Sequence, residues 1–352
     1  MAKPLSYREQ EKIENTQRLR ELLKELPAYV KDFFRAKEQS TSDKSRLSYA
    51  YDLRIFFRFL LENNPALKEK KIADISIADL ASLGSGDFEE YTEYLKAYSG
   101  PDSRHVTNSR LGISRKLSCL RSFFDYLCKR ELLERNPVRL VDMPKIKDKS
   151  IIQLDPDEVA QLLDYMEDLG KELTGLKLAH YNKQKTRDMA IITLFLGTGI
   201  RVSELVGLNL DDVDFKNDGI RISRKGGNEM IVYFGQEVEN ALLDYLEQTR
   251  NQTTALPGHE EALFLSNRRQ RISVDAVEML VKKYCSAVSL KHITPHKLRS
   301  TYGTALYRET QDIYLVADVL GHSDVNTTKR HYAAIKDSHR RSVRNKVKLR
   351  EP

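Results

Sequence analysis

Residues 294–332 read TPHKLRSTYGTALYRETQDIYLVADVLGHSDVNTTKRHY, and this stretch carries the most informative pattern in the chain. Thr294 and Pro295 predict a helix start, because Thr can cap a helix and Pro suits its first position. His296 and Arg299 then fall in the first turn and, spaced i, i+3, share one face of the helix. The partly positive helix end and its free N–H groups favour a phosphate there. The pattern indicates an acid–base group beside a guanidinium at an anion site.

A second cluster closes the same stretch. Gly321 is predicted to end one helix, His322 to lie in the turn, and Ser323 to cap the next helix. Tyr332 follows His322 by ten residues, on or near the end of that helix. The cluster thus places one histidine just before a short predicted helix and one tyrosine at or near the end of that helix.

A third cluster lies at residues 197–205, GTGIRVSEL. Arg201 follows a glycine-rich break after an apolar helix that runs from Met189 to Leu196, and the chain then resumes as a helix. An arginine held at such a break can present its fork to a phosphate with two parallel hydrogen bonds. Glu204 lies one turn later and is suited to orienting Arg201 or a nearby group. A purely structural ion pair is the alternative.

A fourth cluster is a predicted β-hairpin. Residues 220–222 and 230–234 are β-prone runs joined through Lys225-Gly226-Gly227-Asn228, which is a hairpin signal. The glycines allow a tight turn and leave Lys225 able to swing toward a partner. The alternative is a lysine that serves only solubility.

Length and composition limit the classes of protein. A chain of 352 residues with 40% apolar residues suits two folded domains. No apolar run approaches the ~20 residues of a membrane span, and the start lacks a signal segment, so we expect a cytosolic protein. Three scattered cysteines, Cys119, Cys128 and Cys285, suit neither a disulfide framework nor a zinc site. The net charge of +7 leans toward a polyanionic partner.

The first two-thirds of the N-terminal half is predicted to form helices without strands. Long amphipathic helices are predicted at 43–62 and at about 105–130, with a shorter one near 87–98 and a turn at Gly100-Pro101-Asp102. Their polar sides suit phosphates, although a solvated surface is the alternative. The candidate phosphate-binding residues on these polar sides are Lys44, Arg46, Arg54, Arg58, Arg110, Arg115, Lys116 and Arg121.

Two breaks divide the chain. Two prolines and a run of alternating charge near 136–153 indicate an exposed linker, which we place at 143–153, and Leu154-Asp155-Pro156-Asp157 predicts the first helix of the next domain. Residues 339–352 form a basic tail. We therefore expect a domain at 1–142, the linker, a second domain at 154–338, and the tail.

Together the four clusters resemble the tyrosine recombinase/phage integrase family. The family pattern is an Arg in G-x-R-x-S-E-L, a hairpin Lys, H-x-x-R, L-G-H, and a Tyr about ten residues later. The R-K-G-G sequence of the hairpin, the T-P-H-K-L-R run and an insertion near 168–186 are most similar to Xer-type recombinases, in particular to those of Firmicutes that work as a single protein. Two departures are Ser300, where His is frequent, and His331 before the tyrosine.

The resemblance implies a fold and a reaction. It implies a mainly α, α+β chain built as a C-shaped two-domain DNA clamp, with a helical SAM-like core-binding domain and a catalytic domain that holds the small β-sheet. It implies Tyr332 as the nucleophile that forms a 3′-phosphotyrosine, without metal or other cofactor. Tyr302 would be a core aromatic, and Tyr307 and Tyr314 are predicted on packing faces. The implied catalytic set is Arg201, Lys225, His296, Arg299, His322 and Tyr332, with Glu204 behind it.

The implied partners are double-stranded DNA at a specific site and three further copies of the chain in a homotetramer on two sites, in the cytoplasm and associated with the nucleoid. A type IB topoisomerase and a non-catalytic DNA-binding accessory protein are the alternatives. The DNA target, the choice between chromosome dimer resolution (a role in chromosome partition and cell division) and mobile-element integration or excision, the order of strand exchange, and an activating partner protein stay open.

Overall fold

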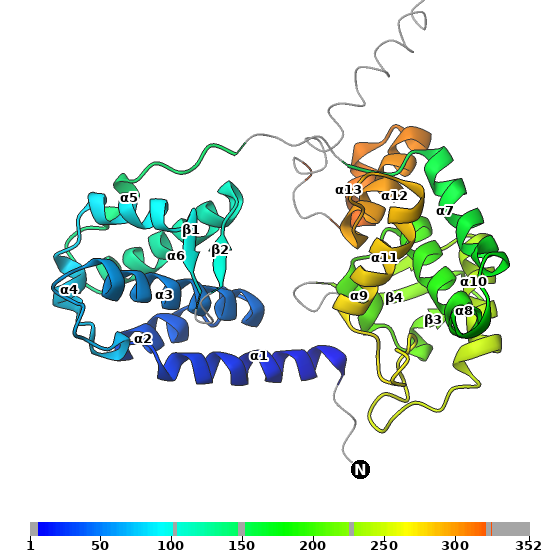
Figure 1. Ribbon diagram of the computed structural model, residues 1–352, viewed down its shortest axis with the longest axis horizontal. Coiled ribbons are helices and arrows are strands. Elements are labelled where there is room, and N and C mark those ends of the chain that lie inside the picture. The colour runs from blue at the N-terminus through cyan, green and yellow to red at the C-terminus, as the bar shows by residue number, and fades with distance from the viewer. Residues whose placement is uncertain (1–5, 101–103, 147–151, 225–228, 322–324, 326–352) are drawn as a thin grey trace, which may run out of the picture. The chain divides into compact units, whose positions relative to one another are not determined.

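The computed structural model describes residues 6–100, 104–146, 152–224, 229–321 and 325 (Figure 1). The chain divides into two compact units, Met1–Lys149 and Ser150–Pro352. Helices dominate both units, and the small sheets are antiparallel. The predicted class, mainly α with a small β-sheet in the second domain, is confirmed. Within the described ranges, no helix is long and apolar enough to cross a membrane.

The first unit is a helical bundle. Its elements are α1 Tyr7–Lys24, α2 Ala28–Ala36, α3 Asp43–Asn63, η1 Ile72–Asp74, α4 Ile77–Ala81, α5 Ser85–Tyr94, β1 Ala97–Ser99, β2 His105–Thr107, α6 Arg110–Lys129 and η2 Pro137–Leu140. Helix α3 begins after Ser42, whose hydroxyl accepts from the Ser45 N–H, and it packs against α1 and α6 (Figure 1). Aromatic side chains fill the core, where the Phe56 ring stacks on Phe88 at 5.5 Å and meets Phe124 edge-on. The long helix expected at 43–62 is confirmed.

Two local predictions for this unit are wrong. Residues 105–107 form strand β2, which pairs with β1, so the unit has strands and α6 begins at Arg110. The physical reason is a break in the helical pattern: the Asn108 side chain donates to Leu95 O, and Ser109 caps α6 through the Gly112 N–H. The shorter helix covers Ser85–Tyr94 instead of reaching residue 98, because residues 97–99 are in β1.

The second unit holds the arginine-rich clusters. Its elements are α7 Pro156–Asp168, η3 Leu169–Lys171, α8 Gly175–Thr198, α9 Val202–Gly207, η4 Leu210–Asp212, β3 Val213–Asp214, β4 Gly219–Ser223, β5 Glu229–Tyr233, α10 Gln236–Tyr245, η5 Leu246–Arg250 (a π-helical turn), α11 Val274–Val288, α12 Pro295–Thr310 and α13 Ile313–Leu320. Helix α8 is the centre of the unit and packs against α10 and α12. Strands β4 and β5 pair as predicted, with Ile220 opposite Val232, while β3 adds a third strand that the pattern did not indicate.

Hydrogen bonds tie the start of this unit to α12. Leu154 donates its N–H to the Thr301 hydroxyl at 3.0 Å, and Thr304 bonds the Gln153 side chain. Helix α7 begins at Pro156, and the Glu158 carboxylate accepts from the Asp155 N–H at 2.8 Å. The predicted helix starts at 156 and 295 are both confirmed. The hydrogen bonds of Leu154 and Gln153 hold α12 against the start of the unit.

Candidate active site

Arg201 lies between two helices. Helix α8 ends at Thr198, and the next residue, Gly199, has a left-handed φ of +61°, where a Cβ would press on Tyr302 and Leu320. The chain then turns so that Arg201 is the residue before α9. Glu204, which is buried, accepts the Arg201 backbone N–H at 2.7 Å and its Nη1 at 2.8 Å. The carboxylate therefore fixes both the backbone and the guanidinium of Arg201.

Arg299 lies in the first turn of α12 and is 3% exposed. Its Nη1 donates to Gly199 O at the end of α8, and its Nη2 donates to Leu320 O at the end of α13. His296, three residues earlier on the same helix, is exposed. The first turn of α12 thus presents an exposed imidazole and a buried guanidinium.

The end of α13 is where three arginines meet. Arg201 Nη2 donates to Gly321 O at 3.0 Å, and Arg299 reaches Leu320 O. Arg224, just past β4, donates to Val319 O at 2.7 Å and Asp318 O at 3.3 Å. The last carbonyls of a helix have no partner within it and carry partial negative charge, so guanidinium donors suit them. Arg224 was not singled out by the sequence, although it directly precedes Lys225.

This cluster has the charge and donors of an oxyanion site. Three guanidinium groups converge on one helix end, and one of them, that of Arg201, is paired with the Glu204 carboxylate. A guanidinium has five N–H donors, and the contacts of Arg201 to Glu204 and Gly321 use two of them. The Arg201 side chain is 38% exposed, so it can donate to an incoming phosphate.

Three predicted catalytic residues, Lys225, His322 and Tyr332, lie outside the described residues, as do Ser323 and the tail at 339–352. Gly321 ends α13 with φ +59°, as predicted. Tyr302 and Tyr307 pack with Leu320, as predicted. Tyr314 does not, since it is 64% exposed on the first turn of α13. The Asp312 side chain caps that turn, and the core side of α13 is taken by Val316 and Leu320 instead.

The eight basic candidates of the first unit differ in burial and in their internal partners. Arg46 and Lys116 are buried, which contradicts their expected place on the polar sides of their helices. Arg46 pairs with Asp43 and Glu38, and Lys116 donates to Asn108 at 2.8 Å. Arg121 donates to the carbonyls of Val138 and Val141. The reason is that long basic side chains can bury their stems and satisfy local acceptors.

Arg115 and Arg54 are also paired, although less buried. Arg115 makes a bidentate pair with Asp52 at 2.6 and 2.7 Å, and Asp52 is 1% exposed. Arg54 contacts Glu25 at 3.2 Å. Lys44, whose nearest acid Glu11 is 3.9 Å away, is exposed, Arg110 is exposed, and Arg58 is partly exposed. These last three residues offer the most charge to an external phosphate.

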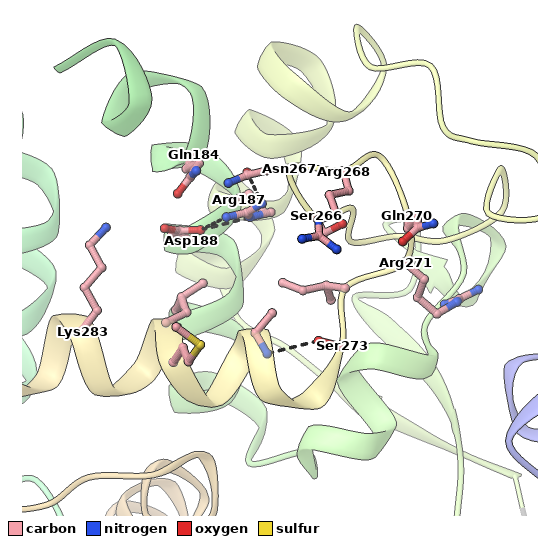
Figure 2. Close-up of a pocket in the computed structure, with 14 residues that line it drawn as sticks. Gln184, Arg187, Asp188, Ser266, Asn267, Arg268, Gln270, Arg271, Ser273 and Lys283 are labelled. Atoms are coloured by element: carbon pink, nitrogen blue, oxygen red, sulfur yellow. Dashed lines mark hydrogen bonds and ion pairs between the residues drawn. The ribbon is translucent and has the colours of Figure 1, made fainter. Parts of the chain in front are cut away.

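A large cavity of about 800 Å³ lies elsewhere in the second unit, between α8, the 266–273 loop and α11 (Figure 2). Its wall includes Arg187, which bonds Asp188 at 2.7 and 3.0 Å, as Figure 2 shows. Asp188 also accepts from Tyr284 at 2.9 Å. Because this buried pair neutralises itself, and because none of the three clustered arginines lines the cavity, the end of α13 is the better candidate site. Within the described ranges, no group of His, Cys, Asp and Glu residues could hold a metal ion.

Comparison with known proteins gives concordant matches. The model of the phage integrase family matches residues 153–339. Tyrosine recombinase XerC of Caldanaerobacter subterraneus subsp. tengcongensis is 36% identical over 313 residues, covering 86% of this chain and 81% of the relative. Tyrosine recombinase XerS of Streptococcus agalactiae is 30% identical over 349 residues, covering 93% and 97%.

Solved structures share the fold. The XerH site-specific recombinase bound to a palindromic difH substrate gives a TM-score of 0.61 at 19% identity, covering 88% of this chain and 81% of that chain. A lambda integrase dimer bound to a COC′ core site gives 0.59 at 15% identity, covering 92% and 98%.

Proposed function

The chain belongs to the phage integrase family of site-specific DNA recombinases, and we propose that it cuts and rejoins its target through a 3′-phosphotyrosine on Tyr332. The tyrosine oxygen attacks the scissile phosphorus, a Tyr–O–P bond forms, and the bond from phosphorus to the 5′-oxygen breaks. The ordinary tyrosine pKa lies near 10, so the hydroxyl must lose its proton during attack. Rejoining reverses these steps, and the covalent bond conserves the energy for it.

The arginine cluster supplies the charge for this reaction. Arg201 and Arg299 would hold the two non-bridging oxygens as negative charge gathers on them, and they keep their protons at any working pH. Glu204 would hold Arg201 in place. Lys225 would give a proton to the leaving 5′-oxygen, His296 would assist proton transfer, and His322 would donate a hydrogen bond to the phosphate. Since these side chains can perform each task, the mechanism we propose uses no metal or cofactor.

One observation carries the proposal most strongly. Arg201 and Arg299 are ninety-eight positions apart in the chain, yet both donate to neighbouring carbonyls at Gly321 and Leu320. His322 follows Gly321 directly, and Tyr332 lies ten residues further on. Two arginines of the implied catalytic set therefore meet at the end of α13, and a third member of the set, His322, is the next residue in the sequence after Gly321.

The test is a covalent trapping experiment on the tyrosine. Tyr332→Phe should bind target DNA as well as the parent protein and form no SDS-resistant adduct with a nicked suicide substrate. Tyr314→Phe is the matched control, because Tyr314 is an exposed tyrosine of the same region. It should trap DNA normally. An adduct with Tyr332→Phe, or its loss with Tyr314→Phe, would show that the nucleophile is wrongly assigned.

We propose double-stranded DNA as the substrate, held by both units in the manner of a clamp. The basic groups best placed for phosphates in the first unit are Lys44, Arg58 and Arg110, because the other candidates make closer internal contacts. The internal contacts of Arg110 with Lys145 O and of Lys44 with Glu11 are long, at 3.4 and 3.9 Å. The match to XerS over nearly the whole chain supports an Xer-like role, resolving chromosome dimers in the nucleoid. Mapping the covalent cut sites on genomic DNA separates this from a mobile element: one chromosomal site supports it, and cuts at the ends of an inserted element contradict it.

The active assembly we propose is a homotetramer on two DNA sites. Exchange between two duplexes requires four strands to be cut, while one chain carries one nucleophile, so four protomers are needed. A topoisomerase needs only one. A two-site recombination assay beside a supercoil-relaxation assay distinguishes them, and relaxation without recombinant products would favour the topoisomerase.

A further inference from the structure

A second pocket of the second unit, with a volume of about 450 Å³, shares Arg187 with the larger cavity of Figure 2. Sites for small molecules commonly have volumes of ~300–1,000 Å³, so this pocket is large enough for one. Four of its lining residues are Lys or Arg and six are Ser, Thr, Asn or Gln, while none of these described lining residues is Asp or Glu. Such a wall favours an anion that also forms hydrogen bonds.

Arg250 is the most buried cation of this wall, with 6% of its surface exposed. It ends the π-helical turn η5, in which the Asn251 N–H donates to Leu246 O at 2.9 Å, and single π-helical turns are frequent at functional sites. Its Nε donates to Ala262 O and its Nη2 to Glu260 O, while its Nη1 bonds no other described residue. Because a guanidinium needs acceptors for all its N–H groups, water or a ligand in the pocket must supply one to Nη1.

The cations of the pocket differ in how their charge is balanced. The Arg187 guanidinium is paired with Asp188, and its Nη1 donates to Asn267 Oδ1 at 3.2 Å, as Figure 2 shows. The other three form no ion pair with a described residue; they are Lys183, Arg250 and Arg269. The pocket therefore has an excess of positive charge for a ligand to neutralise.

Arg269 holds a strained backbone conformation at this pocket. Its φ of +60° is left-handed, a region that glycine adopts at less cost than arginine. The turn is fixed by the Ser266 N–H, which donates to Gln270 O at 2.7 Å, and by the Leu256 N–H, which donates to Arg269 O at 2.8 Å. The strain thus falls on a residue that brings an exposed guanidinium to the pocket.

We propose that this pocket binds an organic phosphate of about the size of a nucleotide. The three cations without a carboxylate partner supply the charge for the phosphate, since guanidinium and ammonium groups both bind phosphate oxygens. The neutral polar residues bind the hydroxyl groups of the ligand body. One of them, Thr249, is held in place by the Thr186 hydroxyl at 2.8 Å. The inference does not depend on the recombination chemistry proposed above.

A small ligand suits this pocket better than a phosphate of the DNA backbone. Arg250 and two other lining residues, Tyr245 and Leu265, are 6%, 1% and 4% exposed, so part of the wall is deep in the protein. A backbone phosphate is attached to a duplex, which contacts exposed groups and cannot enter a cavity of about 450 Å³. A separate nucleotide can.

The test is calorimetric titration of the full chain, without DNA, using AMP and ATP as probes and inorganic phosphate as the comparison. At least one nucleotide should bind with a Kd below about 1 mM. Inorganic phosphate should bind about tenfold more weakly or worse, because it lacks the body that the polar residues contact. Failure of both nucleotides to bind in this range would overturn the proposal, as would equal affinity for inorganic phosphate.

A charge-matched pair of double variants locates the site. Lys183→Ala/Arg269→Ala should weaken nucleotide binding about 10- to 100-fold, the effect of losing charge-assisted hydrogen bonds. Lys177→Ala/Arg268→Ala is the control, because Lys177 is exposed on the same helix α8, Arg268 is exposed in the same turn, and neither lines this pocket. It removes the same charge and should bind within about twofold of the parent, since distant surface charges are screened. All four side chains are exposed, so both variants should fold, which thermal melting without ligand checks.

Two further readouts separate this inference from its rivals. Equal loss of nucleotide affinity in both double variants would show unspecific attraction and overturn the proposal. Fluorescence anisotropy with target DNA should give the parent affinity for Lys183→Ala/Arg269→Ala; a loss of DNA affinity with nucleotide binding unchanged would assign these cations to the DNA instead. Tyr332→Phe should bind nucleotide as the parent does, so an error in the assigned nucleophile would leave the pocket's role standing.

Discussion

Arg201 and Arg299 carry the same guanidinium in different surroundings. Arg299 is 3% exposed and bonds only backbone carbonyls among its described contacts, while the Arg201 side chain is 38% exposed and paired with Glu204. The side chains of both reach the end of α13, so both are suited to binding the scissile phosphate. Their contributions to folding should differ, because water can replace a partner only where it has access.

Substituting each arginine by alanine tests this difference. Arg299→Ala leaves two buried carbonyls, Gly199 O and Leu320 O, without this donor and should lower the free energy of unfolding by about 2–4 kcal/mol. Arg201→Ala is combined with Glu204→Gln, because the buried Glu204 carboxylate would otherwise be left without its guanidinium partner, and this double variant should cost about 1 kcal/mol, since solvent can reach the exposed part of the Arg201 side chain. Both variants should lose adduct formation. Urea unfolding monitored by circular dichroism gives the comparison, and equal losses would contradict the difference in burial.

At the scale of elements, a buried carboxylate joins α3 to α6. Asp52 on α3 receives the bidentate pair from Arg115 on α6, and Lys116 lies 3.9 Å away. Burial raises the pKa of Asp52, and the two cations lower it. Arg115, which the sequence placed on an exposed basic face, thus forms an ion pair that joins α3 to α6.

Removing Arg115 should make the stability of the first unit depend on pH. In Arg115→Met the Asp52 pKa should rise further above its unfolded value, because the largest lowering partner is lost. The folded state then binds the proton more tightly than the unfolded state, so the variant should gain stability as pH falls through the raised pKa. At neutral pH the loss should be about 2–3 kcal/mol, somewhat less than for a fully buried pair because Arg115 is 47% exposed.

Asp52→Asn in the Arg115→Met background is the control. It removes the uncompensated charge and should recover part of the stability at pH 7 while abolishing the added pH dependence. Denaturation curves from pH 5 to 8 measure both effects. A variant whose loss does not change across that range would show that Asp52 is not the group responsible.

At the scale of the whole molecule, DNA affinity should depend on salt through the exposed basic groups. Each phosphate contact contributes about −0.9 to the slope of log K against log salt, so the Lys44→Ala/Arg58→Ala/Arg110→Ala variant should flatten the slope by up to about three. Arg139→Ala is the matched control, because Arg139 is 68% exposed but bidentate with Asp125. It should leave the slope unchanged. Fluorescence anisotropy across a salt series measures this, and an unaltered slope in the triple variant would assign its residues to the solvated surface.

Assembly belongs to the same scale. Twenty residues follow Tyr332, and we propose that the basic tail at 339–352 docks on a neighbouring copy in a closed ring. Deleting 339–352 should abolish the tetrameric synapse and leave single-site binding intact, as gel-shift assays with one and two sites would report. Weaker single-site binding with synapsis preserved at higher protein concentration would instead assign the tail to phosphate contacts within its own protomer.

The sequence by itself determined the family, the main helices and the local starts and ends near the site. These features depend on near neighbours: Pro295 at a first helical position, left-handed glycines at 199 and 321, and Glu204 one turn after Arg201 are all readable within a few residues. The ordered set of motifs was specific because chemistry requires those side chain types together.

Only the tertiary structure decided which basic residues face inward and which groups share the end of α13. Arg46 and Lys116 have the same local pattern as exposed basic residues, and their burial depends on acceptors such as Glu38 and Asn108, which local helix periodicity does not reveal. Arg224 meets Val319 across ninety-five positions. Such contacts follow from how helices pack around a shared core, a global balance of burial and hydrogen bonding that no short window of sequence contains.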